Sequence, residues 1–197
     1  MSEEKNVYFY FDFGSPASYL AWTQLPRISK ENNAKLNMIP ILLGGVFKLT
    51  GNSPPGSVPA KGKWMNNDLQ RYAEMYGVEF VRNDYFPINT LYLMRGALAA
   101  IELNIFKKYV EHIYKGIWTL NLNLGDTEVL KNYLEECKIN SDEIINLCQK
   151  DEIKQKLIGN TEKAVSKGIF GAPSIFVDNE MYFGQDRLFW VEKALKI

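Results

Sequence analysis

A serine at the start of a predicted helix is the first group in this sequence whose surroundings favour chemistry. Ser15 follows Gly14 and precedes Pro16, where a strand gives way to a helix. Unpaired backbone N–H groups and the helix dipole favour an anion at such a junction, and a serine hydroxyl can donate one more hydrogen bond. Ser15 and Ser18 also have the spacing of a Cys-x-x-Cys motif with oxygen replacing both sulfurs. The alternative is that Ser15 is only the helix N-cap.

Two further groups lie near the other end of the chain. Pro173 follows Ala172 and directly precedes a predicted strand, where an ordinary turn would also explain it. Asp186 lies at the predicted start of the last helix, beside Gln185. Its carboxylate could bind an ammonium group of a ligand, or it could simply complement the helix dipole as a first-turn acid.

The pattern of elements predicts an α/β fold that brings these groups together. A buried strand over 7–13, a helix over 17–30 and a strand over 35–43 form a βαβ unit. Residues 44–63 carry five glycines and three prolines and predict a long irregular loop. The chain closes with strands over 174–177 and 181–183 and an amphipathic helix over 185–196. Between loop and closing strands lie helical patterns over 66–76, 89–103, 105–120, 126–137, 141–150 and 151–167, with capping groups at Asp126 and Ser141.

This order predicts a thioredoxin-like domain, residues 1–43 and 168–197, with an inserted helical domain, residues 44–167. Formal net charge is zero, which argues against a nucleic-acid or membrane partner. No apolar run is long enough for a signal peptide or a membrane span, so we expect a cytoplasmic protein. Cys137 and Cys148 match no metal or redox spacing and are expected to pack as free thiols. The single histidine, His112, has no motif around it and is expected to be structural.

Seven stretches together carry a resemblance to a known family. The chain resembles the 2-hydroxychromene-2-carboxylate isomerases and the related kappa-class glutathione transferases, both in the DsbA-like thioredoxin superfamily. The resemblance covers nearly the whole chain. The stretches are FYFDFGSPASYL (9–20), GNSPPG (51–56), PAKGK (59–63), DLQRY (68–72), FPINT (86–90), FGAPS (170–174) and FGQDR (183–187).

The resemblance implies a glutathione site with an assigned role for each residue. Ser15, at the start of the helix with Pro16 and Ala17, would hydrogen-bond the glutathione sulfur and favour its thiolate. Ala172 would pair its backbone with the cysteinyl part of glutathione, because it precedes Pro173, which is expected to be a cis proline. The other implied ligands are Asn52, Pro59 and Lys61 along the glutathione molecule, and Gln185 and Asp186 at its γ-glutamyl end.

The implied activity is a reversible addition of the glutathione thiolate to a conjugated aromatic substrate, followed by bond rotation and elimination. A transferase that conjugates glutathione to electrophiles is the alternative enzyme. A thioredoxin-fold binding protein without turnover is an alternative of another class, and a disulfide oxidoreductase is disfavoured because the dithiol is absent. Phe47 stands where the isomerases are expected to have a lysine for the substrate carboxylate, and the loop before Pro59 is shorter. Relatives are often dimers, and the sequence leaves a homodimer open.

Overall fold

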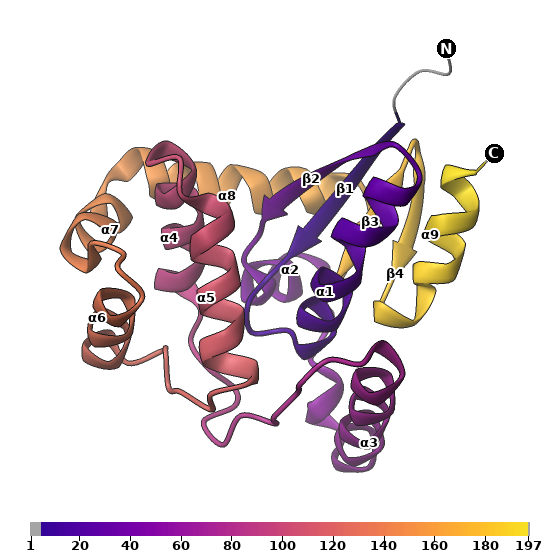
Figure 1. Cartoon of the computed structure of the whole chain (residues 1–197), viewed down its shortest axis with the longest axis horizontal. Helices are drawn as coiled ribbons and strands as arrows, with labels where there is room; N and C mark the ends of the chain where they lie inside the picture. Colours follow the sequence, from indigo (N-terminus) through magenta and orange to yellow (C-terminus); the bar gives the residue numbers. More distant parts are fainter. Residues whose placement is uncertain (1–4, 197) are drawn as a thin grey trace.

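A four-stranded mixed sheet organises the molecule, which is described here by a computed structural model covering residues 5–196 (Figure 1). The strand order is β2-β1-β3-β4, with β1 parallel to β2 and antiparallel to β3. β3 and β4 form an antiparallel hairpin. The predicted βαβ unit and closing hairpin are therefore confirmed. The strands are Lys5–Phe11 (β1), Ala34–Pro40 (β2), Ser174–Val177 (β3) and Glu180–Phe183 (β4).

β1 does not alternate between apolar and polar residues because both of its faces are covered. Val7, Phe9 and Phe11 belong to the main core cluster. Tyr10 points the other way, into a smaller cluster that includes Val46 and residues of the helix before β3. A central strand buried on both faces needs apolar residues in consecutive positions. This explains the nearly continuous aromatic run that predicted the strand.

The first helix, α1 (Pro16–Glu31), begins with proline, which suits a helix start because its missing N–H has no partner to lose there. It packs beside the last helix, α9 (Leu188–Leu195), on the side of the sheet that faces the main core. Figure 1 shows α1 and α9 side by side near the β3–β4 edge. The predicted closing helix over 185–196 is divided, because a 3-10 turn, Gln185–Arg187 (η2), precedes α9.

Helices make up the regular secondary structure between β2 and β3, and the prediction of a loop over 44–63 is wrong. A short helix and a 3-10 turn occupy this range, and the next helix already begins at Pro59. Gly44 and Gly45 lie within α2, and Gly51 is its left-handed C-cap, with a φ of 72°. The other two glycines of this range, Gly56 and Gly62, lie in η1 and α3. The helical elements are Leu43–Thr50 (α2), Pro55–Ser57 (η1), Pro59–Tyr76 (α3), Leu91–Glu102 (α4), Phe106–Trp118 (α5), Thr127–Glu136 (α6), Ser141–Gln149 (α7) and Asp151–Ser166 (α8).

Helix caps follow the sequence at one site and depart from it at another. The Asp126 side chain caps α6 by accepting from the N–H groups of Glu128 and Val129, as predicted. At α7 the cap is Asn140 rather than Ser141, because the asparagine oxygen accepts from the N–H of Glu143.

No helix in the described range is long and apolar enough to cross a membrane. The division of the chain into a core domain and an inserted domain stays a prediction.

α5 connects the helices between β2 and β3 to the end of β1. Its apolar face buries Tyr109, Tyr114 and Trp118, and the Tyr114 ring lies 4.9 Å from that of Phe13. The indole N–H of Trp118 donates to the carbonyl of Phe13 over 2.9 Å. A buried indole needs such a partner, and here the partner is the loop that precedes α1. α5 thus helps to fix the position of the helix start at Ser15.

Candidate functional site

Ser15 is the N-cap of α1 and makes two hydrogen bonds with one hydroxyl. Its Oγ accepts from the backbone N–H of Ser18 over 3.1 Å and donates to the backbone carbonyl of Ala172 over 2.9 Å. The capping interpretation is therefore correct as far as it goes, but it does not account for the second bond. Only 5% of Ser15 is exposed. The side chain joins the start of α1 to a loop from the other end of the chain.

The partner loop carries the predicted cis proline, because the Ala172–Pro173 bond is cis. The hydroxyl of Ser174 donates to the carbonyl of Gly171 within the same loop, over 2.9 Å. The side-chain amide of Asn52 donates to the carbonyl of Phe170 over 2.8 Å. Asn52 therefore reaches this loop from the segment after α2, and its amide group is used by the protein itself.

The turn at 184–186 connects to the same loop from the far side. The N–H of Gly184 donates to the carbonyl of Pro173 over 3.1 Å. Gly184 has a φ of 105°, and a Cβ at this position would collide with a carboxylate oxygen of Asp186. The Asp186 carboxylate lies 3.2 Å from the Nε of Arg187 and is partly exposed. Gln185 and Asp186, both predicted as ligands, therefore directly follow Gly184, the residue that bonds to Pro173.

Tyr76, a residue missed by sequence reasoning, contributes a polar contact to this turn. Its hydroxyl donates to the carbonyl of Gln185 over 2.6 Å. Burial, helped by Tyr72 and Asp186, raises the pKa of Tyr76 to about 12, so the hydroxyl keeps its proton at neutral pH. The acceptor is a backbone atom 109 residues away, which no side-chain pattern could have indicated.

A second residue missed by sequence reasoning is Asp12, which holds the loop between β1 and α1. Its Oδ1 accepts from the N–H of Gly14 and its Oδ2 from the N–H of Leu43, over 2.9 and 2.8 Å. Burial raises the pKa of Asp12, and these bonds together with one from Thr90 oppose that rise. The available signal was an acidic residue directly after a fully buried strand, since buried carboxylates need partners.

Pro59 and Lys61 are not brought into this network. Both are exposed in the first turn of α3. Within residues 5–196, no hydrogen bond between side chains and no ion pair joins them to the groups around Ser15. Their predicted roles therefore depend on a ligand long enough to reach them.

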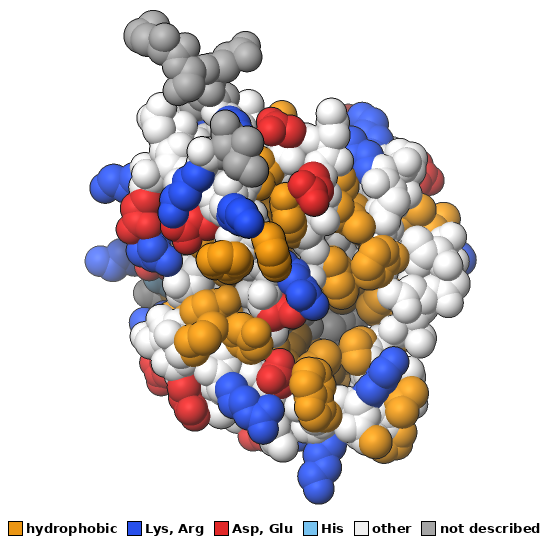
Figure 2. All heavy atoms as spheres, turned by 90° about the vertical axis from the view of Figure 1, so that its right-hand side faces the viewer, with side chains coloured by type: hydrophobic (Ala, Val, Ile, Leu, Met, Phe, Trp, Pro, Cys, Tyr) orange, Lys and Arg blue, Asp and Glu red, His pale blue; other side chains and the backbone are white. Residues whose placement is uncertain are grey.

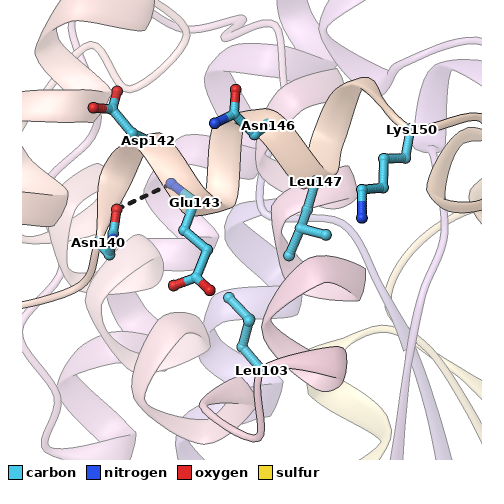
Figure 3. Close-up of a pocket in the computed structure, with 7 residues that line it drawn as sticks. All are labelled: Leu103, Asn140, Asp142, Glu143, Asn146, Leu147 and Lys150. Carbon is cyan, nitrogen blue, oxygen red and sulfur yellow. Dashed lines mark hydrogen bonds between the residues drawn. The ribbon is translucent and has the colours of Figure 1, made fainter.

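A hollow in the surface lies elsewhere and does not coincide with this site. It has a volume of about 500 Å³ and lies around α7, far from α1 and the closing hairpin (Figures 1 and 3). In Figure 3 the Asn140 side chain caps α7 at the N–H of Glu143, the Glu143 carboxylate extends toward Leu103, and the Asp142 carboxylate points away from it. None of its lining residues contacts Ser15 or the loops around it. They are Leu103, Asn140, Asp142, Glu143, Asn146, Leu147 and Lys150. We place the candidate site at Ser15, where buried polar groups from three segments converge.

The polar groups at Ser15 suit an anion held by an extended ligand. Pro16 lacks an N–H, and the N–H groups of Ser18 and Tyr19 bond to Ser15. Among the described residues, this leaves the N–H of Ala17 as the free donor in the first turn of α1, beside a hydroxyl that can redirect its proton. The hydroxyl of Ser18 is buried and has no partner in the described part of the chain. The cis-proline loop and the 184–186 turn extend the site away from α1.

Comparisons with known proteins show the family of this chain. Residues 6–196 match the DSBA-like thioredoxin domain family. The chain is 30% identical to a 2-hydroxychromene-2-carboxylate isomerase of Pseudomonas putida, over 96% of this chain and 93% of that protein. It is 27% identical to human glutathione S-transferase kappa 1, over 93% of this chain and 88% of the human protein.

A solved structure has the same fold as this chain. A 2-hydroxychromene-2-carboxylate isomerase superposes with a TM-score of 0.86 and 24% sequence identity. The match covers 97% of this chain and 94% of the solved one, so the sheet and the helices between β2 and β3 are included. At this identity the superposition compares folds, and the residues around Ser15 have to be judged by their own geometry.

Proposed function

Because this chain belongs to the DSBA-like thioredoxin domain family, and within it to the family of the 2-hydroxychromene-2-carboxylate isomerases, we propose that it is a glutathione-dependent isomerase in which Ser15 stabilises the glutathione thiolate. The membership confirms the predicted fold class and the resemblance stated from the sequence. The chain is an enzyme of the isomerase or glutathione transferase kind. The observation that supports the proposal best is the buried Ser15 hydroxyl, placed between the start of α1 and the backbone of Ala172.

Glutathione fits the chemistry of the groups present. It carries a thiol, an ammonium group, two carboxylates and two peptide groups, and when bound it supplies a thiolate nucleophile for a conjugated substrate. The site offers the Ser15 hydroxyl and the Ala17 N–H to an anion, and the Asp186 carboxylate to a cation. Lys61 is exposed and has no ion-pair partner within residues 5–196, so its ammonium group is open to a ligand carboxylate.

Ser15 has to exchange one acceptor for another to perform this role. In the structure its proton points to the carbonyl of Ala172. A thiolate at the start of α1 is an anionic acceptor, and hydrogen bonds to charged acceptors are about twice as strong as those to neutral ones. The hydroxyl would turn to the sulfur, while the N–H of Ser18 continues to donate to its Oγ. Lowering a thiol pKa of about 8.5 by one unit requires about 1.4 kcal/mol, which one hydroxyl and a helix start can supply.

The remaining predicted residues have roles along the ligand in this proposal. Ala172, which directly precedes Pro173, would pair its backbone with the cysteinyl unit. Gln185 and Asp186 would hold the γ-glutamyl end, with the carboxylate facing the ammonium group. Asn52 acts mainly by fixing the loop at Phe170, since its amide is engaged there. The first turn of α3, with Pro59 and Lys61, would contact the glycine end of glutathione.

A kappa-type glutathione transferase is the second candidate, and one residue favours it. Phe47, half-buried on α2, stands where a lysine was expected to bind the carboxylate of the chromene substrate. An aromatic ring favours an uncharged electrophile over a carboxylate at this position.

A cytoplasmic location and a homodimer, as expected from the sequence, complete the proposal.

Calorimetric titration with glutathione tests the site, with thiolate absorbance near 240 nm followed in parallel. We expect saturable binding that Asp186→Ala weakens, and a thiolate signal at neutral pH that Ser15→Ala reduces. No binding to the wild-type protein at millimolar glutathione would refute the proposal. Mass spectrometry of the product then distinguishes the two enzymes, because only a transferase releases a stable glutathione adduct.

A further inference from the structure

We propose that Tyr76 is a positioning residue for the γ-glutamyl end of glutathione, acting through the carbonyl of Gln185. This inference depends on the function proposed above and adds to it a residue that none of the stretches resembling the family contains. It starts from the turn at 184–186, which carries the carboxylate of Asp186 and is held from two sides.

On one side the turn is attached to the loop that faces Ser15. The N–H of Gly184 donates to the carbonyl of Pro173, next to Ala172. The φ of 105° at Gly184 is a conformation that residues with a side chain rarely adopt. This attachment sets the distance between the sulfur position at Ser15 and the start of the turn.

On the other side the turn is attached to α3. The hydroxyl of Tyr76, in the last turn of α3, donates to the carbonyl of Gln185 over 2.6 Å. This peptide group leads directly into Asp186, so the bond fixes its plane and the direction in which the next side chain leaves the backbone. Without it, Asp186 would be oriented by the bond between Gly184 and Pro173, two residues earlier in the turn, and by its partly exposed pairing with Arg187.

Tyr76 is half-buried, and its ring lies 5.7 Å from that of Tyr72, so removal of the hydroxyl leaves the ring packed. Burial raises the pKa of the phenol to about 12, still further above neutral pH than its ordinary value, so the hydroxyl remains a donor. Tyr76→Phe therefore removes one donor and little else. The expected consequence is a looser Asp186, and weaker recognition of the ligand group that Asp186 binds.

The chain offers a matched control in Tyr19. Its hydroxyl also donates to a backbone carbonyl over 2.6 Å, that of Glu79, three residues beyond Tyr76. Burial likewise raises its pKa to about 12. This bond anchors the segment after α3 to α1 and does not touch the 184–186 turn. Tyr19→Phe therefore measures what general loosening of the α3 end does to binding.

The experiment is calorimetric titration of the wild-type protein, Tyr76→Phe and Tyr19→Phe with glutathione and with cysteinylglycine, which lacks the γ-glutamyl unit. For Tyr76→Phe we expect glutathione affinity to fall about 3- to 10-fold, the range for one lost hydrogen bond, with cysteinylglycine affinity nearly unchanged. Tyr19→Phe should leave the preference between the two ligands as in the wild-type protein. In an Asp186→Ala background, Tyr76→Phe should cause little further loss.

Equal losses for both ligands in Tyr76→Phe, or the same loss of preference in Tyr19→Phe, would overturn the inference and leave the proposed function standing. Failure of the wild-type protein to bind glutathione would overturn both. If Tyr76→Phe does not fold, Gly184→Ala disturbs the same turn from its other attachment. It should lower glutathione affinity selectively, and an unchanged preference would again refute the inference.

Discussion

The hydroxyl of Ser15 donates a 2.9 Å hydrogen bond to the carbonyl of Ala172, although 157 positions separate the two residues in the sequence. The bond joins the helix start that favours an anion to the loop that presents backbone to an extended ligand. It also satisfies a buried hydroxyl and a buried carbonyl in the free protein. The group proposed to bind the thiolate is therefore held in place before the ligand arrives.

Replacing Ser15 with alanine should lower both stability and activity. The helix loses its N-cap and the Ala172 carbonyl loses its donor, which together cost about 1 to 2 kcal/mol of unfolding free energy. Loss of the donor to the thiolate should raise the pKa of bound glutathione by about one unit and lower the turnover number at pH 7 about 10-fold. Urea unfolding and steady-state kinetics at saturating glutathione measure the two effects.

Asp126→Ala is the control for that variant. Asp126 caps α6 through the N–H groups of Glu128 and Val129, in a part of the helical layer with no contact to Ser15. It should lose similar stability and keep wild-type turnover. Equal turnover in Ser15→Ala and Asp126→Ala would mean that Ser15 is a helix cap and nothing more.

The buried carboxyl of Asp12 predicts a pH dependence of stability. Burial raises its pKa above 3.8, so the folded state holds the proton more tightly than the unfolded state. The stability that this contributes is fully present below pH 3.8 and is lost as the pH rises through the folded pKa. In Asp12→Asn this component is absent. The amide can also accept from only one of the N–H groups of Gly14 and Leu43, so the variant should be about 1 to 3 kcal/mol less stable.

The measurement is urea unfolding of both proteins at pH values from about 3.5, near the usual carboxyl pKa, to about 7. The stability difference between wild type and Asp12→Asn should be largest at the acid end and smaller near neutrality. A difference that grows with pH would contradict the assignment, because it would mean that folding lowers the pKa of Asp12.

Phe47 predicts which substrates the enzyme accepts. Phe47→Lys places an ammonium group where the chromene carboxylate is expected to bind. A partly solvated ion pair is worth up to about 1 kcal/mol, so the KM for a carboxylate substrate should fall by up to about fivefold. The KM for a neutral electrophile should not fall. Phe47→Gln is the uncharged control of similar length, and an equal change in both variants would exclude an ion pair as the cause.

The two cysteines should take no part in turnover. Burial raises the pKa of the Cys148 thiol to about 12, and burial also raises that of Cys137. Since the thiolate is the reactive form, a disulfide reagent at pH 8 should modify Cys137 slowly and leave Cys148 intact in the native protein. The double variant Cys137→Ser, Cys148→Ala should retain activity. Rapid modification of both thiols without unfolding would show that α7 opens readily.

The parts of the site that depend on local chemistry could be predicted from the sequence. Proline after Ser15 marked the helix start, and the βαβ pattern followed from a strand buried on both faces. The glycines at 44 and 45 and the left-handed Gly51 hid α2, because two of them lie inside the helix and the third ends it. Glycine is a poor helix former, so this helix depends on tertiary contacts, namely its packing against α8 and the hydrogen bond from the N–H of Leu43 to Asp12.

Contacts between distant backbone and side-chain atoms could not be predicted. Tyr76 and Asp12 both act on backbone groups, and a backbone carbonyl or N–H carries no mark in the sequence. The same is true of the acceptor of Ser15. Which atoms become such partners depends on how the helices after β2 pack against the sheet, and this depends on the packing of the whole core.

β1 pairs with β2 on one side and with β3 on the other, and these two partners are made at very different times during translation. A nascent chain that has emerged as far as α8 contains Ser15 and Asp12 but has neither the loop at Ala172 nor the turn at Asp186. Its central strand still has an open edge. The ligand site is therefore completed only after β3 and the turn at 184–186 have been made, and a ligand that binds there stabilises chains that contain them over shorter ones.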